Sequence, residues 1–350
     1  MLSEQDYIYD LLTVREKAEV DERNQPIYYY NKIRVDDESH YNETNRLVLK
    51  KSYAIDYRYE VISELGKGAF GNVYLCKDHK REKEVALKVV RNERRFHKQS
   101  KIEVDIYEML LTSGTYSDNI IRILKAFFFR NDVFMVFEVF GINLYQYYQQ
   151  HKISNVDVKS FSRQIANGLK ALHNLNIIHM DLKPENVMVR DKHLKIIDLG
   201  SSIVLNKDKP IYKSYIQSRY YRSPEVVFKL PITTKIDIWS YGCIVYELLT
   251  GRPIFPARCM EDLVIHFVHV LGYPNKDTEG FYDKECFTTH TQELARFRTR
   301  NHRFLYPSQF DWSIIEDEKL KQFIKENCLN WESEKRYSIE QVLEHEYFTS

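Results

Sequence analysis

Apolar and polar residues alternate most regularly in the stretch that follows residue 57. Three runs there are rich in β-branched and aromatic residues with a period of two: Tyr59–Leu65, Asn72–Lys77 and Lys83–Val90. Such runs predict β-strands, and the glycines between the first two predict a tight turn. Two later runs, Ile121–Arg130 and Val133–Phe140, also predict strands.

Helical spacing first appears at Lys98–Leu111, where Ile102, Ile106, Met109 and Leu110 are able to share one face. After residue 141 the pattern becomes mainly helical. Three long segments carry it: Val156–Leu175, Lys235–Thr250 and Met260–Leu271. Strands followed by helices predict an α+β protein of two lobes joined near residues 138–143. A cleft between lobes is a common place for a ligand.

Composition excludes several classes of protein. The chain has 350 residues, of which 43% are hydrophobic and 29% charged, and a net charge of +1. These values predict a soluble globular protein and give no reason to expect nucleic acid or a membrane surface as a partner. The cysteines are scattered without a C-x-x-C pair, and neither disulfides nor zinc is expected: Cys76, Cys243, Cys259, Cys286 and Cys328. We therefore expect an intracellular protein, cytoplasmic or nuclear, and the first residues do not resemble a signal peptide.

A glycine-rich run between the first two predicted strands has the pattern G-x-G-x-x-G-x-V. It consists of Gly66, Lys67, Gly68, Ala69, Phe70, Gly71, Asn72 and Val73. Glycines allow backbone N–H groups to approach a polyphosphate without obstruction by Cβ atoms. An ordinary glycine hairpin explains the run equally well. A dinucleotide-binding fold would need a helix next, whereas strand pattern resumes at Asn72.

Lys88 lies on the third predicted strand, in Val85-Ala86-Leu87-Lys88. An ammonium at this position can pair with nucleotide phosphates if a carboxylate holds it, and Glu103 on the next helix is the candidate. Taken alone, each residue is better explained as a solvated strand lysine or a surface helix glutamate.

The most specific pattern is D-x-K-P-E-N, which begins at Asp181 and brings Lys183 and Asn186 close to it. Phosphoryl transfer needs a carboxylate to orient and deprotonate the attacking hydroxyl, a cation on the phosphoryl group and an oxygen ligand for magnesium. Asp198, in Ile197-Asp198-Leu199-Gly200, supplies a second magnesium ligand after a predicted β pair. An Asp-Gly turn is its simpler explanation.

These motifs, together with Ser223-Pro224-Glu225, residues 237–242 and Arg336, resemble the protein-kinase signature in chain order over roughly residues 57–348. The resemblance implies a two-lobed kinase fold with lobes at 57–140 and 141–348, an insert of the CMGC group at about 272–308, ATP and Mg²⁺. It also implies a Glu225–Arg336 ion pair. It adds the remaining nucleotide contacts: Leu65, the gatekeeper Phe137, and a hinge formed by Glu138, Val139 and Phe140.

A narrower resemblance is to the dual-specificity tyrosine-regulated (DYRK) kinases. It lies in residues 91–99, residues 215–222 and an upstream homology box at Asp36-Asp37-Glu38 and Tyr57-Arg58-Tyr59-Glu60. Leu12-Thr13 with Ile27-Tyr28-Tyr29 is similar to the accessory segment of the class II branch, so residues 1–56 are expected to form an accessory segment. A partly ordered charged tail is the alternative for residues 1–50.

The DYRK resemblance implies phosphorylation of Ser and Thr on protein substrates and autophosphorylation of Tyr215. We expect Arg219 and Arg222 to hold the phosphorylated Tyr215, because guanidinium forks match phosphate geometry. Most kinases carry Arg before the catalytic Asp, and this chain carries Met180 there. The first tyrosine of the family's Tyr-x-Tyr pair is missing, because Ser214 precedes Tyr215 and is itself preceded by a lysine. An unmodified packing tyrosine is the alternative reading of Tyr215.

Two rival functions fit the same plan. A pseudokinase scaffold would bind partners without catalysis, but such proteins lose catalytic residues that this chain retains. A kinase of small molecules or lipids is the second rival, and the Ser-Pro-Glu segment with the long helical lobe favours a protein substrate. We expect a monomer.

Overall fold

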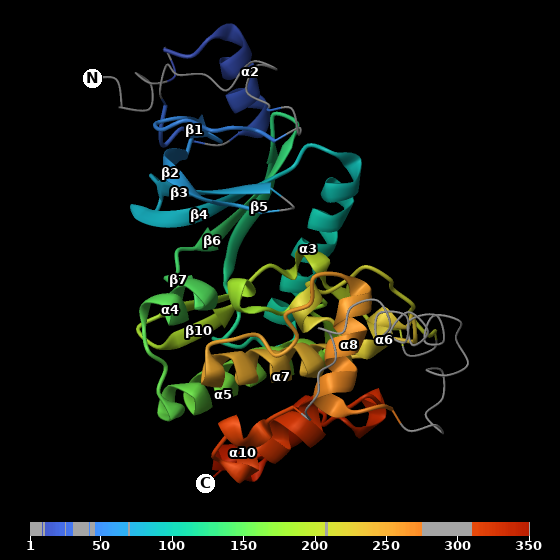
Figure 1. Ribbon diagram of the computed structural model, residues 1–350. Coiled ribbons are helices and arrows are strands. Elements are labelled where there is room, and N and C mark those ends of the chain that lie inside the picture. The colour runs from blue at the N-terminus through green and yellow to red at the C-terminus, as the bar shows by residue number, and fades with distance from the viewer. Residues whose placement is uncertain are drawn as a thin grey trace. The chain divides into compact units, whose positions relative to one another are not determined.

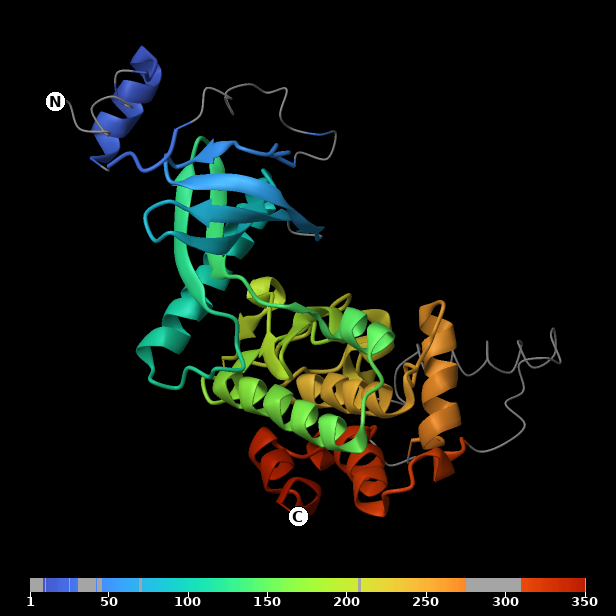
Figure 2. The same cartoon turned by 90° about the vertical axis from the view of Figure 1, so that its left-hand side faces the viewer.

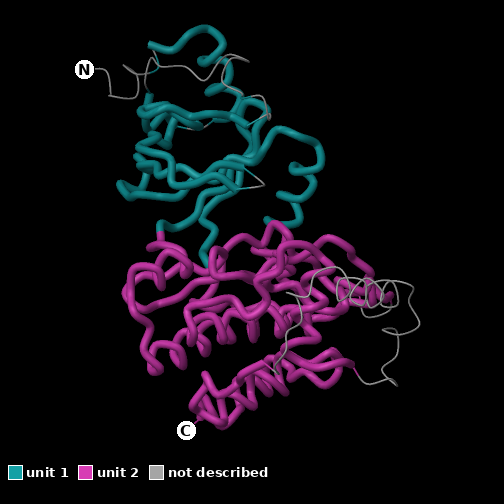
Figure 3. Tube along the Cα trace, in the orientation of Figure 1, with its two compact units in different colours: residues 1–104, 121–139 teal, residues 105–120, 140–350 magenta. Residues whose placement is uncertain are grey.

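The computed structural model of the protein describes residues 9, 11–24, 26–30, 42, 46–68, 71–206, 209–274 and 310–349. The chain divides into two compact units (Figure 3). Unit 1 contains residues 1–104 and 121–139, and unit 2 contains residues 105–120 and 140–350. Within the described ranges, no helix combines the length and apolar character needed to cross a membrane.

Unit 1 is built on a six-stranded antiparallel sheet with the strand order β1-β2-β3-β4-β6-β5 (Figure 1). The predicted strands are confirmed, with ends that differ by a few residues. The elements are α2 (Val14–Arg23), β1 (Ala54–Ile55), β2 (Tyr59–Lys67), β3 (Gly71–Asp78), β4 (Lys83–Val90), the first part of α3 (Arg94–Thr112), β5 (Ile123–Phe129) and β6 (Asp132–Glu138).

The N-terminal segment is part of the unit 1 core. Leu12, Val20 and Ile27 are each less than 10% exposed and belong to the same apolar cluster as the sheet residues Tyr59 and Phe134. Burying a side chain of this size contributes about 1.5–3 kcal/mol. These residues of the N-terminal segment therefore pack against the sheet of unit 1.

Helix α2 begins at a capping box that the sequence contains. The Thr13 hydroxyl accepts a hydrogen bond from the Glu16 N–H, and the Glu16 side chain accepts one from the Thr13 N–H. This exchange satisfies two backbone donors that a helix start leaves unpaired. Helix α2 also contacts the turn between β5 and β6 through Glu19, which lies 3.0 Å from the Arg130 guanidinium. Burial opposes ionisation of Glu19, but hydrogen bonding to Arg130 and Tyr57 holds its pKa below the ordinary value.

Helix α3 extends four residues further toward the N-terminus than predicted, and its buried face differs from the predicted one. Ile102 is 46% exposed, so the prediction that it shares a buried face is wrong. The buried positions include Glu103, Tyr107 and the two predicted residues Ile106 and Leu110. Glu103 takes part in the buried face as the partner of Lys88, which apolar periodicity alone does not reveal.

Unit 2 is mostly helical, with α5 and α7 packed side by side at its centre (Figures 1 and 2). The predicted bounds of α7 and α8 are confirmed, and α5 is confirmed within two residues at each end. Its α-helices are α4 (Leu144–Gln150), α5 (Asn155–His173), α6 (Pro224–Val227), α7 (Lys235–Thr250), α8 (Met260–Leu271), α10 (Glu318–Gln322), α11 (Ile339–Glu344) and α12 (Glu346–Thr349), and η6 (Phe323–Cys328) is a π-helix. Helix α7 is buried nearly all round, as expected of a central helix.

Short elements of unit 2 carry the loops that concern function. They are β7 (Ile142–Asn143), β8 (Ile177–Ile178), η2 (Pro184–Asn186), β9 (Val187–Arg190), β10 (His193–Ile196), η3 (Leu199–Ser201), β11 (Ile203–Val204), η4 (Arg219–Tyr221), η5 (Trp312–Ile314) and η7 (Ser333–Lys335). Strands β7, β9 and β10 form one small antiparallel sheet, and β8 pairs with β11. The Asp36-Asp37-Glu38 motif, Ala69, Phe70 and most of the predicted insert lie outside the described residues.

Candidate active site

A buried ion pair joins β4 to α3 in unit 1. The Lys88 ammonium lies 2.9 Å from both carboxylate oxygens of Glu103, and the two side chains are 11% and 3% exposed. Lys88 is held between Val73 of β3 and Met135 of β6 by the register of the sheet. The structure therefore brings the two sequence candidates together, and a carboxylate at this position fixes the direction in which the ammonium points.

The glycine-rich run forms the turn between β2 and β3, where the Gly68 N–H donates to the Gly71 carbonyl over 2.9 Å. A Cβ atom on Gly71 would lie 1.9 Å from the Val89 carbonyl oxygen, so the pairing of β3 with β4 requires glycine there. A Cβ on Gly66 would meet nothing within 4 Å, and one on Gly68 only the Gly71 carbonyl at 3.8 Å. The fold therefore explains Gly71, whereas Gly66 and Gly68 leave backbone open to a ligand.

Other predicted nucleotide contacts differ in exposure. Leu65 is 52% exposed on β2, and Phe137 is buried on β6. Asn72 is 1% exposed, accepts from Arg46 over 3.3 Å and donates to the Tyr74 hydroxyl over 3.2 Å. Its amide is thus committed to the fold of unit 1, and only its backbone remains a candidate for contact with a nucleotide.

The predicted hinge is divided by the boundary between the units. Glu138 and Val139 end unit 1, and Phe140 begins unit 2. The Glu138 N–H donates to the Arg122 carbonyl over 3.2 Å, and the Glu138 carboxylate accepts from the Arg122 N–H over 2.9 Å. In unit 2 the Phe140 ring lies 4.5 Å from the Arg190 guanidinium.

The loop that carries Asp181 is fastened to helix α7 by one buried carboxylate. Asp237 is 0% exposed and accepts from the backbone N–H groups of His179 (2.8 Å) and Met180 (3.1 Å). It also lies 3.0 Å from His173 Nε2 on α5. Met180 has φ +64°, a conformation that is costly for a non-glycine residue and persists only where the surroundings hold it. These bonds supply that support.

Asp181 is the centre of a hydrogen-bonded cluster in unit 2. Its Oδ2 accepts from the Lys183 ammonium over 2.8 Å, and the Asn186 amide donates to its backbone carbonyl over 2.8 Å. Its Oδ1 accepts from the Ser218 N–H and hydroxyl over 2.9 and 2.8 Å. The Lys183 ammonium donates to the same hydroxyl. Donors on both oxygens fix the carboxylate in one orientation, as catalysis by a general base requires.

Asn186 and Asp198 are linked through the backbone between them. The Ile197 N–H donates to the Asn186 carbonyl over 2.9 Å, and the Ile197 carbonyl lies 3.1 Å from His179 Nε2. Asp198 itself has φ +62° and is half-buried. Among the described residues no three acidic, His or Cys side chains converge as a complete metal cage. An amide and a carboxylate are sufficient for Mg²⁺, which usually keeps phosphate and water as its other ligands.

A second buried ion pair fixes the end of unit 2 to the segment that begins at Ser223. The Arg336 guanidinium binds both Glu225 carboxylate oxygens, at 2.6 and 2.8 Å, and both side chains are nearly inaccessible. The sequence resemblance implied this pair.

Comparison with known proteins decides the family, because the family model described as protein kinase domain matches residues 59–348 of the chain. The chain belongs to the protein kinase family. The predicted α+β kinase fold is thereby confirmed. The chain is 37% identical over 321 residues to dual specificity tyrosine-phosphorylation-regulated kinase 3 of Rattus norvegicus, covering 84% of this chain and 54% of that protein.

Two further relatives are also named as protein kinases. The chain is 36% identical over 310 residues to dual specificity tyrosine-phosphorylation-regulated kinase 4 of Homo sapiens, covering 83% of the chain and 57% of that protein. It is 36% identical over 307 residues to serine/threonine-protein kinase ppk5 of Schizosaccharomyces pombe, covering 83% of the chain and 36% of that protein. The predicted resemblance to DYRK kinases is confirmed. The chain spans about half the length of the curated dual-specificity relatives named here.

In this kinase the segment from Asp198 to Glu225 carries the predicted modification site. Tyr215 is 89% exposed and has φ +84°, an unusual conformation for a bulky residue. The Arg222 guanidinium lies 5.5 Å from the centre of its ring. Arg222 is 8% exposed and donates to the Ile216 and Gln217 carbonyls over 2.9 and 2.8 Å. Arg219 donates to the Arg258 carbonyl over 2.5 Å.

Met180, which replaces the usual arginine of the kinase loop, has an apolar role. It is 4% exposed and lies in a cluster with Ile178, Val226 and Ile236, against which Ile216 packs. The loop before Asp181 is thus joined to the segment around Tyr215 by apolar contacts instead of by a charged group. A phosphate on Tyr215 would have to find its cation elsewhere in this kinase.

Sequence reasoning missed two site residues. Ser218 contacts both Asp181 and Lys183, although it lies 37 positions from Asp181 in the chain. Asp237 was recognised only as part of a motif, and its anchoring bonds became visible only in the structure. The available signal was weak, since a single Ser or Asp in a helical or loop pattern is usually a cap or a surface residue.

Proposed function

We propose that the protein is an ATP-dependent kinase that phosphorylates serine and threonine residues of protein substrates. The observation that carries the proposal is the Asp181 cluster, in which a carboxylate, an ammonium and an amide are held in one turn of chain. Membership of the protein kinase family supports it. Relatives named as dual specificity and as serine/threonine kinases support the choice of hydroxyl.

The catalytic roles follow from the chemistry of each group. Asp181 orients the attacking hydroxyl and accepts its proton, and Lys183 stabilises charge on the phosphoryl group as it moves. Lys88, fixed by Glu103, binds the phosphates of ATP. Gly66 and Gly68 allow backbone N–H groups to approach those phosphates, since no side chain stands in the way.

Mg²⁺ is proposed as the metal, held by Asn186 and Asp198. Their oxygen atoms suit a hard cation, and two protein ligands leave room for phosphate oxygens and water. When bound, the metal neutralises charge on the phosphates. In unit 2 the bond from Ile197 to Asn186 keeps the two ligand-bearing segments in register.

Autophosphorylation of Tyr215 is the proposed maturation step, with Arg219 and Arg222 as the groups that hold the phosphate. The exposure of Tyr215 supports it, as does the position of Arg222 against its ring. Burial and the neighbouring Arg219 lower the pKa of Arg222, whereas Tyr215 and Asp181 act in the opposite direction. A phosphate on Tyr215 would add an anion beside Arg222.

The remaining proposals concern the whole protein. We place a kinase domain at 57–348 and an accessory segment of the class II DYRK type at 1–56, supported by the burial of Leu12, Val20 and Ile27 in the unit 1 core. We propose that the protein acts as a monomer in the cytoplasm, the nucleus or both.

The test is a phosphate-transfer assay with radiolabelled ATP on peptide arrays that offer Ser, Thr or Tyr. We expect Ser and Thr peptides to be labelled. Asp181→Asn should reduce transfer by about 10²–10⁴-fold while ATP binding, measured by calorimetry, stays near the wild-type value. Wild-type protein that binds ATP but labels no peptide and no Tyr215 would favour the pseudokinase alternative. Full turnover by the Asp181 variant would remove the assigned base.

A further inference from the structure

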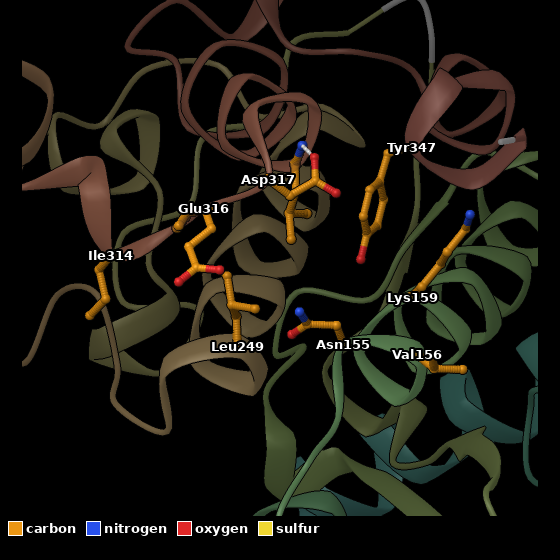
Figure 4. Close-up of a pocket in the computed structure, with 10 residues that line it drawn as sticks. Asn155, Val156, Lys159, Leu249, Ile314, Glu316, Asp317 and Tyr347 are labelled. Carbon is orange, nitrogen blue, oxygen red and sulfur yellow. Dashed lines mark hydrogen bonds between the residues drawn. The ribbon is translucent and has the colours of Figure 1, made fainter.

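Unit 2 contains a cavity that none of the proposed catalytic residues lines. It has a volume of about 510 Å³ and lies between the start of α5, the end of α7, the segment before α10, and α12 (Figure 4). This volume is within the range of about 300–1,000 Å³ that is common for ligand sites. Its walls combine apolar side chains, among them Leu249, Ile315 and Leu320, with polar ones such as those of Asn155 and Glu316.

One polar group, the hydroxyl of Tyr347, is directed into this cavity. Tyr347 is 6% exposed, and its ring is fixed by packing against Phe348 and by the Lys159 ammonium 5.7 Å from its centre. Figure 4 shows the hydroxyl end of Tyr347 directed into the cavity toward Asn155. Among the described residues no hydrogen-bond partner of this hydroxyl is found. Burial and the nearby Asp317 raise the pKa of Tyr347 to about 12, so the group stays a neutral donor and acceptor.

The rim of the cavity is more negative than positive. It carries the carboxylates of Glu316 and Asp317 and a single ammonium, that of Lys159. Asp317 caps α10 by accepting from the Leu320 N–H over 3.0 Å, whereas Glu316 is exposed and has no ion-pair partner among the described residues. Helix ends of both signs meet here, since α7 ends at the cavity while α5 and α10 begin there. The excess of carboxylates over ammonium groups on the rim therefore carries the preference for a cationic occupant.

Two of the lining residues are exposed and apolar. Val156 is 78% exposed and Ile314 is 56% exposed, and Figure 4 shows them on opposite sides of the group of lining residues. A compact small molecule would fill the cavity and leave these side chains in water. An extended chain could fill the cavity with one side chain and cover the flanking residues with its neighbours.

We propose that this cavity is a docking site for a short basic and apolar segment of a protein partner. An apolar side chain such as Leu, Ile, Met or Phe would enter between Leu249 and Leu320, and a Lys or Arg one to three residues away would pair with Glu316. A backbone group of the segment would meet the Tyr347 hydroxyl. The proposal goes beyond phosphoryl transfer, because binding here requires neither ATP nor the Asp181 cluster.

The test uses fluorescein-labelled hexapeptides on a Gly-Ser background. Each peptide carries one residue from Leu, Ile, Met or Phe, and one from Arg, Lys, Asp or Glu, one to three positions apart. Fluorescence anisotropy measures their binding to the full chain. We expect peptides with Arg or Lys to bind at least tenfold more tightly than their acidic counterparts, and peptides without the apolar residue to lose binding.

Two variants locate the binding to this cavity without disturbing the core. Glu316→Lys changes an exposed side chain and should reverse the charge preference, so that Asp and Glu peptides bind best. Tyr347→Phe keeps the ring and should weaken binding about threefold, as expected for one neutral hydrogen bond. Glu108→Lys, the same charge reversal at an exposed position of α3, is the matched control and should change nothing.

Several outcomes would overturn the proposal. They are absence of binding by every peptide, equal binding of basic and acidic peptides, an unchanged preference in Glu316→Lys, and equally tight binding of octylamine as a compact cation. The same measurements on Asp181→Asn should give wild-type affinities. Failure of docking and failure of the proposed catalysis are therefore separate results.

Discussion

Unit 2 contains two buried arginine sites that differ in what they bind. Arg336 is 1% exposed and forms a two-pronged ion pair with Glu225. Arg222 is 8% exposed and donates only to backbone carbonyls and to the Met260 sulfur. Among the described residues no carboxylate pairs with Arg222 or with its neighbour Arg219.

Arg336 is permanently paired with a carboxylate, whereas the described residues offer no carboxylate as an ion-pair partner to Arg222. A buried charge that has its partner is neutralised by the fold itself, whereas a buried charge without one is costly unless hydrogen bonds compensate it. Glu225 makes the Arg336 site complete as synthesised. We propose that a phosphate on Tyr215, which is exposed beside Arg222, completes this second site.

The largest expected effect comes from breaking the complete site. Glu225→Gln should lower the free energy of unfolding of the protein by about 3–5 kcal/mol, because it leaves the Arg336 guanidinium buried without a counter-charge. Denaturant unfolding followed by fluorescence measures this loss. The control is Lys335→Met, which removes an exposed cation paired with Glu332 over 2.6 Å and should cost less than about 1 kcal/mol. Equal losses in the two variants would show that the buried Glu225–Arg336 pair contributes no more to stability than an exposed pair.

The next effect concerns the incomplete site. Dephosphorylation of wild-type protein should lower its stability by about 1–3 kcal/mol, since one to three charge-assisted hydrogen bonds to Arg219 and Arg222 are lost. In Tyr215→Phe, phosphatase treatment should have no effect, and kinase activity should be lower than in the wild type without being abolished. Tyr212→Phe, also exposed, is the matched control. Mass spectrometry must locate the phosphate, and active protein that is unmodified at Tyr215 contradicts the proposal.

The two arginines of that site should also differ from each other. Arg219 is exposed, so Arg219→Gln should leave the dephosphorylated protein within about 0.5 kcal/mol of the wild type and remove part of the gain on phosphorylation. Arg222→Lys should destabilise both forms, because a lysine cannot reproduce the fork that reaches the Ile216 and Gln217 carbonyls. Thermal unfolding of each variant before and after phosphatase treatment gives the comparison. Indistinguishable effects in the two variants would rule out separate roles.

The sequence predicted elements well where one physical signal dominated. Helices α7 and α8 have continuous apolar patterns, and both were predicted with the bounds that the structure has. The buried face of α3 was misjudged at Ile102 because the face is set by the partner of Lys88, and a carboxylate does not count in an apolar pattern. Helix α2 was missed, although Thr13 and Glu16 form a capping box that the sequence displays.

The candidate site was predictable where its residues are neighbours in the chain. Asp181, Lys183 and Asn186 lie within six positions, and their motif is specific enough to predict the cluster. The Ser218 contact depends on how the segment after Asp198 returns, which no local pattern records. The apolar role of Met180 likewise depends on Ile216 and Ile236, which come from distant parts of the chain.

The smallest expected effect concerns a third buried charge, Glu247, which has hydroxyl partners but no arginine. It is 3% exposed and accepts from Tyr148 over 2.6 Å and from Tyr221 over 2.7 Å. Burial raises the pKa of Glu247 above its ordinary value of 4.5, although the two hydroxyl groups oppose the shift. The folded state therefore holds this proton more tightly than the unfolded state, and stability falls as pH rises from about 4.5 through the raised pKa.

Glu247→Gln should remove that part of the pH dependence, because glutamine is neutral at every pH and can still accept from one hydroxyl. The free energy of unfolding of the variant, measured between pH 4.5 and 8, should decline less with pH than that of the wild type, by less than the loss in Glu225→Gln. The matched control is Glu344→Gln, an exposed carboxylate on α11 that should leave the slope unchanged. A steeper decline in Glu247→Gln would mean that the hydroxyl groups of Tyr148 and Tyr221 compensate the buried charge as fully as Arg336 compensates Glu225.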